Sequence, residues 1–161
     1  LEGFQAGLSW RTVLYKRNNF RQAFDDFDVE KISSYDPVKI AELLSNPGII
    51  RNKSKIQACV TNSQAFLKVK QEFGTFDAYI WSFVQGKTIH NKWKCVGDLP
   101  SETRESEKMS ADLTMRGFKF VGPKICYAYM QATGMVNDHT TDCYRYNELV
   151  GKKTGDRRVN R

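Results

Sequence analysis

The stretch RGFKFVGPKICYAYMQATGMVNDHTTDC, residues 116–143, contains the turn that decides the predicted fold. Gly117 suits the left-handed position after a helix end, and Pro123 suits the first turn of a new helix, where no backbone donor is lost. These residues predict a helix, a tight hairpin and a second helix. Exposed amides at the start of the second helix, with Lys119 and Lys124 beside them, form a candidate site for a nucleic-acid phosphate. An ordinary interhelical turn is the alternative.

The same stretch ends in a possible half of a metal site, His139-x-x-x-Cys143. On a helical turn, side chains at i and i+4 lie on one face, which is a spacing that zinc ligands use. A structural role without metal is the alternative, because no partner pair of ligands is visible in the sequence.

Helical periodicity extends through the rest of the chain. The strongest pattern predicts a helix over residues 53–70, in a helical stretch that Gly74 ends. Residues on one face of this helix recur at spacings of three and four: Ile56, Cys59, Val60, Ser63, Phe66 and Leu67. Further helices are predicted after the N-caps Ser9, Asp28 and Asp36, over 18–27 with core residues Phe20, Phe24 and Phe27, and over 75–84, 101–116 and 123–133. Residues 86–100 lack periodicity and are predicted to be a loop, with a strand-like piece as the alternative. Strand alternation does not persist, so the sequence predicts an all-α single domain over residues 1–150.

The chain is strongly basic, with a formal net charge of +7 and a sequence pI near 9.3. Such a balance favours a polyanionic partner. The last residues, GKKTGDRRVNR (151–161), carry five cations without an apolar pattern, and we expect a flexible basic tail. Apolar runs all fall short of the ~20 residues that cross a bilayer, so no membrane partner is expected.

Four cysteines, Cys59, Cys95, Cys126 and Cys143, are scattered along the chain. They form no recognisable disulfide framework, and Cys59 and Cys126 fall within apolar helical patterns. Free thiols are typical of a reducing compartment, so we expect a cytoplasmic protein.

Four blocks of the sequence, in order, are similar to the DNA-3-methyladenine glycosylase I family: LEGFQAGLSW (1–10), NPGIIRNKSKIQA (46–58), YIWSFV (79–84) and RGFKFVGPKICYAYMQATGMVNDH (116–139). The resemblance covers most of the chain, to about Cys143. It implies the helix–hairpin–helix DNA glycosylase fold, with residues 117–122 as the hairpin. It also implies an enzyme of base-excision repair that flips 3-methyladenine out of alkylated double-stranded DNA and hydrolyses its N-glycosidic bond, without lyase activity.

The resemblance assigns the base pocket to Glu2 and Trp10. Glu2 corresponds to the family's pocket carboxylate, which contacts the base edge and favours the positive form of the base. Trp10 would stack on that cationic base. From the residues alone, Glu2 is a helix-surface charge and Trp10 is a core side chain.

The DNA contacts implied by the resemblance lie in two places. Gln5, Gly7 and Leu8 match the loop that fills the gap left by the flipped base, although ordinary packing is the alternative for Leu8. Phosphate contacts are expected at Lys119, Gly122 and Lys124, and in addition at Arg51 and Lys53.

The resemblance also implies a structural zinc ion, with His139 and Cys143 as two of its ligands. In the family, about three dozen residues precede the position of Leu1 and supply a Cys and a His. This chain lacks them, so it is expected to be truncated there, and His90 and Cys95 would replace those ligands only by coincidence. Many helix–hairpin–helix glycosylases carry a catalytic Asp beyond the hairpin, which the resemblance implies is absent in this family. Asp138, near that position, is expected to cap a helix or to support His139, and a chemical role is the alternative left open.

Two other classes of function compete with the glycosylase. A noncatalytic helix–hairpin–helix fragment or decayed homologue would bind DNA without releasing base, and a basic helical adaptor would bind protein. For the glycosylase we expect no obligate protein partner and a monomer.

Overall fold

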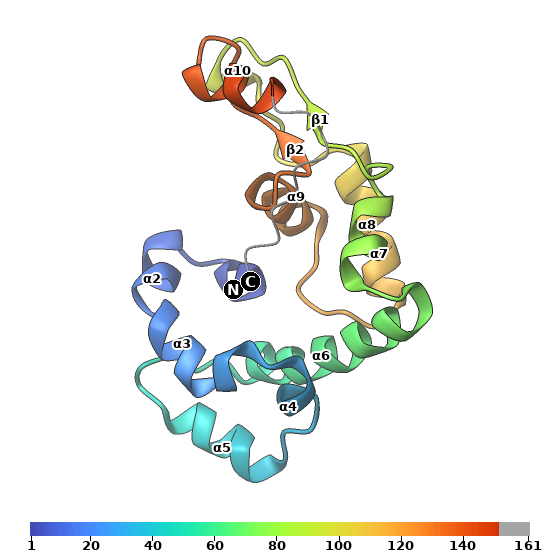
Figure 1. The fold of residues 1–161 in the computed structure, drawn as a ribbon. Coiled ribbons are helices and arrows are strands. Elements are labelled where there is room, and N and C mark those ends of the chain that lie inside the picture. Colours follow the sequence, from blue (N-terminus) through green and yellow to red (C-terminus); the bar gives the residue numbers. More distant parts are fainter. Residues whose placement is uncertain (152–161) are drawn as a thin grey trace.

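The computed structural model describes residues 1–151 and consists mainly of helices (Figure 1). The elements are α1 (Glu2–Gln5), α2 (Trp10–Tyr15), α3 (Arg17–Ala23), η1 (Asp25–Phe27), α4 (Val29–Ser33), α5 (Pro37–Ser45), α6 (Lys53–Phe73), α7 (Phe76–Ser82), β1 (Ile89–His90), η2 (Val96–Asp98), α8 (Arg104–Met115), α9 (Pro123–Ala132), β2 (Val136–Asn137) and α10 (Tyr144–Val150). The predicted all-α class is confirmed. The expected basic tail lies outside the described residues, apart from Gly151.

Two hydrophobic clusters share the long helix α6. One contains Ile56 of α6 together with side chains of α1, α3, α4 and α5. The other contains Ala65 and Val69 of α6 together with side chains of α7, α8 and α9. In Figure 1, α3–α5 accordingly flank the first half of α6, and α7 and α8 rise from its far end. Helix α6 therefore joins the two halves of the molecule.

The start and the end of α6 follow from local signals. The Oδ1 atom of Asn52 accepts a hydrogen bond from the Lys55 amide at 3.0 Å, which satisfies an amide that has no partner within the helix. Gly74 ends the helix with a φ of +79°, a conformation that glycine adopts without steric cost. The predicted helix and its stop are both confirmed, and the helix extends to Phe73.

The hairpin between α8 and α9 forms as predicted. The amide of Phe118 donates to the carbonyl of Leu113 and the amide of Gly117 donates to that of Thr114, each at 3.0 Å. This pair of bonds, with Gly117 at a φ of +94°, is the Schellman arrangement. Pro123 is the first residue of α9, as expected from its missing backbone donor.

The predicted loop over residues 86–100 contains a short strand. Residues Ile89 and His90 pair in parallel with Val136 and Asn137. A two-residue strand is too short to show alternation, so its sequence carries no strand signal. The pairing fixes this long connection to the segment that follows α9.

A left-handed turn over residues 25–27 overturns one core prediction. Asp25, Asp26 and Phe27 have φ values of +48°, +56° and +60°, so the helical register breaks after Phe24. Phe20 and Phe24 are buried as predicted, whereas Phe27 is 43% exposed. Each left-handed residue costs roughly 1–2 kcal/mol, so other contacts must stabilise this turn.

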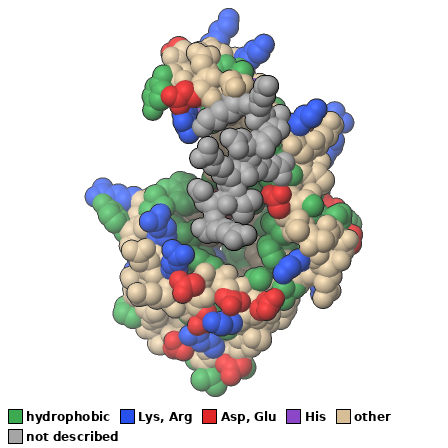
Figure 2. All heavy atoms as spheres, viewed as in Figure 1, with side chains coloured by type: hydrophobic (Ala, Val, Ile, Leu, Met, Phe, Trp, Pro, Cys, Tyr) green, Lys and Arg blue, Asp and Glu red, His purple; other side chains and the backbone are tan. Residues whose placement is uncertain are grey.

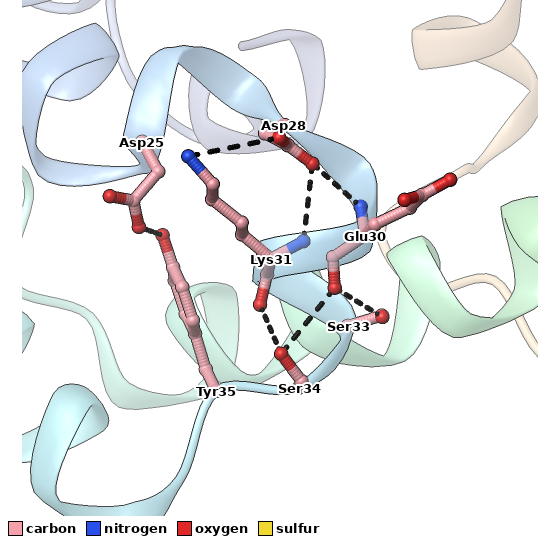
Figure 3. A network of polar contacts seen from close by, with 7 residues as sticks. All are labelled: Asp25, Asp28, Glu30, Lys31, Ser33, Ser34 and Tyr35. Carbon is pink, nitrogen blue, oxygen red and sulfur yellow. Dashed lines mark hydrogen bonds and ion pairs between the residues drawn. The ribbon is translucent and has the colours of Figure 1, made fainter.

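Polar contacts offset that strain (Figure 3). The hydroxyl of Tyr35 donates to Asp25 Oδ2 at 2.6 Å. The Oδ1 atom of Asp28 accepts from the amides of Glu30 and Lys31 and so caps α4, as the sequence predicts. These bonds hold the turn against the cluster that contains α1.

No helix within residues 1–151 has both the length and the apolar character needed to cross a bilayer.

Replacing Tyr35 by Phe should lower the free energy of unfolding by about 1–2 kcal/mol, because the Asp25 carboxylate loses its hydroxyl donor. Urea denaturation would measure the change. Tyr144→Phe is the matched control, since Tyr144 is 77% exposed and should change stability by less than about 0.5 kcal/mol. Equal stability of the Tyr35 variant and the wild type would show that this bond does not stabilise the turn.

Candidate active site

A cavity of about 170 Å³ lies between α1, the middle of α6 and the helices of the second cluster. Its walls are aromatic and aliphatic side chains from α7, α8, α9 and the hairpin, among them Phe76, Phe118 and Phe120. Glu2 is the only charged side chain that residues 1–151 contribute to its lining. The face in Figure 2 is hollowed between the two halves of the molecule, and hydrophobic side chains lie on the walls of that hollow. Such a lining suits a flat organic group.

Glu2 is the first residue of α1, and one oxygen of its carboxyl group has no hydrogen-bond donor among the described residues. Its Oε2 atom is buried and makes no hydrogen bond within the described residues. Burial raises the pKa of Glu2 above its ordinary value. A buried acceptor without a donor carries a desolvation cost that a donor or a cation in the cavity would relieve.

The loop after α1 projects an apolar side chain toward solvent. Gln5 ends α1 and donates from Nε2 to the carbonyl of Leu8 at 2.9 Å. Gly7 has a φ of +75°, which makes the sharp turn possible. Leu8 is 37% exposed, so it is not an ordinary core residue.

Trp10 lies apart from the cavity lining. It is the first residue of α2, behind the N-cap Ser9, and it is 36% exposed. The expectation from the residues alone, a core position, is wrong. Its expected stacking on a base remains a prediction.

Lys55 is a buried cation that the sequence analysis missed. Only 7% of its surface is exposed, and its Nζ atom donates to the carbonyls of Phe4 at 2.9 Å and Ala6 at 2.5 Å. The same ammonium lies 5.8 Å from the centre of the Phe120 ring. The signal available in the sequence was a lysine four residues before Cys59, on the face of the helix that carries the apolar stripe.

Asn62 lies two turns after Lys55 on the same face of α6, and its side chain holds the hairpin. Its Oδ1 atom accepts from the Lys119 amide at 2.7 Å, and its Nδ2 atom donates to the Lys119 carbonyl at 3.0 Å. The side chain of Lys119 is left exposed, as is that of Lys124. Gly122 is the N-cap of α9 and offers no side-chain cap, so the first amides of α9 are open to an anion. Arg51 and Lys53, at the earlier turn, are exposed as well.

His139 and Cys143 lie side by side, although not on a helix. Residues 139–143 form a turn, and Cys143 is the N-cap of α10, so the expected helical turn is wrong. His139 Nδ1 and Cys143 Sγ are 3.6 Å apart. Zinc–nitrogen and zinc–sulfur bonds of about 2.0 and 2.3 Å at a tetrahedral angle give a separation of about 3.5 Å, so this pair fits two ligands of one zinc ion.

The described residues do not complete that site. They contain no group of three or more His, Cys, Asp or Glu side chains that could hold a metal ion. His90 is turned to Asn137, at 3.2 Å, and Cys95 is an exposed free thiol. Neither replaces a missing ligand.

Asp138 is the centre of a hydrogen-bond network that joins α9 to the loop after β1. It accepts four hydrogen bonds of 2.5–2.8 Å, from Tyr127, Gln131, Asn91 and Trp93. Burial opposes ionisation of Asp138, but these donors outweigh it and hold its pKa below the ordinary value. The expectation that Asp138 caps a helix or supports His139 is wrong. The carboxylate is occupied by structural contacts.

Comparisons with known proteins agree with this architecture. A family model described as methyladenine glycosylase matches residues 1–146. The chain is 43% identical over 146 residues to DNA-3-methyladenine glycosylase 1 of Escherichia coli (strain K12), across 91% of this chain and 78% of the relative. It is 43% identical to DNA-3-methyladenine glycosylase of Haemophilus influenzae, across 89% of this chain and 77% of the relative.

Solved structures show the same likeness. A crystal structure of 3-methyladenine DNA glycosylase I superimposes with a TM-score of 0.84 at 45% identity, covering 89% of this chain and 79% of that one. The Staphylococcus aureus enzyme, solved for the structural basis of 3-methyladenine recognition, gives 0.85 at 34% identity, covering 89% and 76%. The fold is that of the helical DNA glycosylases. The chain belongs to the methyladenine glycosylase family.

Replacing Asp138 by Asn should lower the free energy of unfolding by about 3 kcal/mol, because an amide cannot accept from all four donors. Base release per folded molecule, measured well below the melting temperature, should persist because Asp138 is not a catalytic acid. Asp142→Asn, at an exposed position, is the control and should leave stability nearly unchanged. A stable Asp138→Asn protein without activity would contradict the structural assignment.

Proposed function

We propose that this protein releases 3-methyladenine from alkylated double-stranded DNA by hydrolysing the N-glycosidic bond, which leaves an abasic site for base-excision repair. The observation that carries the proposal is the cavity in which Glu2 is the only charged lining residue among those described, with a buried oxygen that has no donor within residues 1–151. The names of the relatives support the same substrate, since those proteins are 3-methyladenine DNA glycosylases.

The chemistry of the substrate fits this cavity. A base within a duplex is out of reach, so the nucleotide must rotate out of the stack at a cost of a few kcal/mol. N-methylation at position 3 makes the base cationic, so apolar walls with a single carboxylate favour it over a neutral base. We assign Glu2 as the catalytic residue that accepts a hydrogen bond from the base edge and stabilises its positive form.

Bond cleavage then needs little acid assistance. The electron pair of the bond between the sugar C1′ and the base moves to the cationic base, which leaves as a neutral molecule. Positive charge develops on the sugar, and a water molecule adds at C1′ and loses a proton to solvent, which leaves a hydroxyl on the sugar and completes hydrolysis. Water, not an amine of the protein, is the nucleophile, so the proposal includes no lyase step. Trp10 is proposed to stack on the base, which requires its exposed ring to turn toward the cavity when DNA binds.

Two parts of the surface are proposed to hold the DNA. The helix–hairpin–helix of α8 and α9 would contact phosphates through Lys119, Lys124 and the amides beyond Gly122. Leu8, exposed at the turn of Gly7 and supported by Gln5, would fill the gap left by the flipped base. The net charge of +7 favours this polyanionic partner.

We also propose a structural zinc ion held by His139 and Cys143, whose 3.6 Å separation suits adjacent tetrahedral ligands. The ion would fix the turn that precedes α10. A cytoplasmic monomer is proposed as well, and the absence of any disulfide among the four cysteines supports a reducing compartment.

Glu2→Gln should reduce the release of free 3-methyladenine from methylated duplex DNA on the order of 10²–10³-fold, because a neutral amide lacks the negative charge that attracts the cationic base. In the wild type, activity should fall as the pH drops through the raised pKa of Glu2, as the carboxylate becomes protonated. Measured release across pH checks both effects. Unchanged activity of the Gln variant would refute the pocket assignment.

The same variant should be more stable than the wild type at neutral pH. A carboxyl group with a raised pKa in the folded protein contributes most below its unfolded pKa, and that contribution is lost as the pH rises through the folded pKa. Glu107→Gln, at an exposed position on α8, is the control for the loss of one negative charge.

Cobalt(II) added to the protein should give a thiolate-to-metal charge-transfer band, because Cys143 would ligate the ion together with His139. Cys143→Ser should abolish this band in the absorption spectrum. Cys95→Ser is the matched control, since Cys95 is exposed and lies outside the proposed site. A band that survives in the Cys143 variant, or is lost in the Cys95 variant, would contradict the ligand assignment.

A further inference from the structure

Lys55 holds three parts of the site together through one ammonium group. Its backbone belongs to the first turn of α6, and its Nζ atom bonds the carbonyls of Phe4 and Ala6. Those carbonyls lie at the C-terminal end of α1, where a helix leaves its last acceptors without internal partners. The Phe120 ring of the hairpin lies 5.8 Å from the same ammonium.

The energetics of Lys55 show that packing alone does not explain it. A lysine that is 7% exposed loses most of its hydration, and burial lowers its pKa. It forms no ion pair among those of the described residues, so no carboxylate repays that loss. An apolar side chain of similar length would fill the same space without this cost. What the ammonium adds is direction, because its donors fix the positions of two particular carbonyl groups.

These two carbonyls belong to α1 and to the start of the following loop, which carry the residues assigned to the reaction. Phe4 is followed by Gln5 and Ala6, so the bonds of Lys55 bracket the end of α1 and the beginning of the loop that carries Leu8. Glu2 lies on the same short helix, only two residues before Phe4. A four-residue helix has little stability of its own, so the depth of Glu2 and the direction of Leu8 depend on external contacts.

We propose that Lys55 is a positioning residue for base release. It holds Glu2 and the loop of Leu8 in fixed positions relative to the hairpin, so that the base pocket and the gap-filling side chain are correctly placed at the same time. Lys55 does not touch the base in this role. Misplacement of reacting groups by about 1 Å can cost on the order of 10²-fold in rate, so loss of this anchor acts mainly on the chemical step. The inference rests on the proposed glycosylase activity.

The test is Lys55→Met, which keeps the length of the side chain and removes the donors and the charge. The single-turnover rate of 3-methyladenine release, with enzyme in excess over methylated duplex, should fall on the order of 10- to 100-fold. Affinity for an undamaged duplex, which has no gap for Leu8 to fill, should change far less, because Asn62 still holds the hairpin. Lys55→Gln, which retains an N–H donor, should recover part of the rate.

The control is Lys70→Met, which removes one charge from an exposed position of the same helix and should leave the rate unchanged. Thermal denaturation separates a positioning role from a structural one. A lower melting temperature with a normal rate per folded molecule would overturn the proposal, as would equal losses in rate and DNA affinity. If Lys55→Met does not fold, the rate and affinity of Lys55→Gln decide by the same criteria. Wild-type release in the same assay tests the proposed function itself, so the two failures are distinguishable.

Discussion

Helix α6 is the constraint on which the rest of the molecule depends. Its 21 residues span about 30 Å at the rise of an α-helix, long enough to take part in two separate hydrophobic clusters. Ile56 belongs to one cluster and Val69 to the other, while Asn62 between them lines the cavity. Because each half of the chain packs on its own end of α6, the space above the middle of the helix is left open. A hollow among apolar side chains costs stability, which is consistent with a site kept for a ligand.

The charged residues around this hollow differ in sign and in location: the cations are on the surface, and the carboxylate of Glu2 lines the cavity. The molecule carries a net +7, and Lys119 and Lys124 are exposed beside the open end of α9. These cations act through solvent and attract phosphates over distances near the Debye length, about 8–10 Å at ordinary ionic strength. Glu2 acts within the cavity, where the dielectric is lower and a single charge has more influence. In the proposed function, attraction of DNA and selection of a cationic base are thereby separated in space.

Features governed by neighbours in sequence could be predicted from sequence. The N-caps Asp28 and Asp36, the stop at Gly74 and the hairpin after Gly117 each depend on contacts within a few residues. Helix α6 was predictable because its apolar stripe persists from Ile56 to Leu67, about three turns. The glycosylase family was recognisable from four ordered blocks, and with it the position of Glu2 in a pocket.

The failures arise where distant contacts decide. Phe27 follows the helical period but is displaced by a left-handed turn that Tyr35 stabilises from ten residues away. Lys55 and Asn62 form bonds across about 50 residues of sequence, with α1 and with the hairpin. Neither residue type predicts such a partner. Sequence reasoning therefore anticipated local elements, and a place for Glu2 in a pocket, better than the long-range contacts of Lys55 and Asn62.

The contrast between two half-buried acids bears on how the proposed site would act with one carboxylate. Four donors saturate Asp138 and stabilise its charge. Glu2 has a buried oxygen without a donor, and burial raises its pKa. A saturated carboxylate gains little from a further positive charge, whereas an unsupported one gains much. In the proposed mechanism a cationic leaving group supplies that charge itself, so a carboxylate oxygen that has no donor within residues 1–151 gains a partner when the damaged base binds.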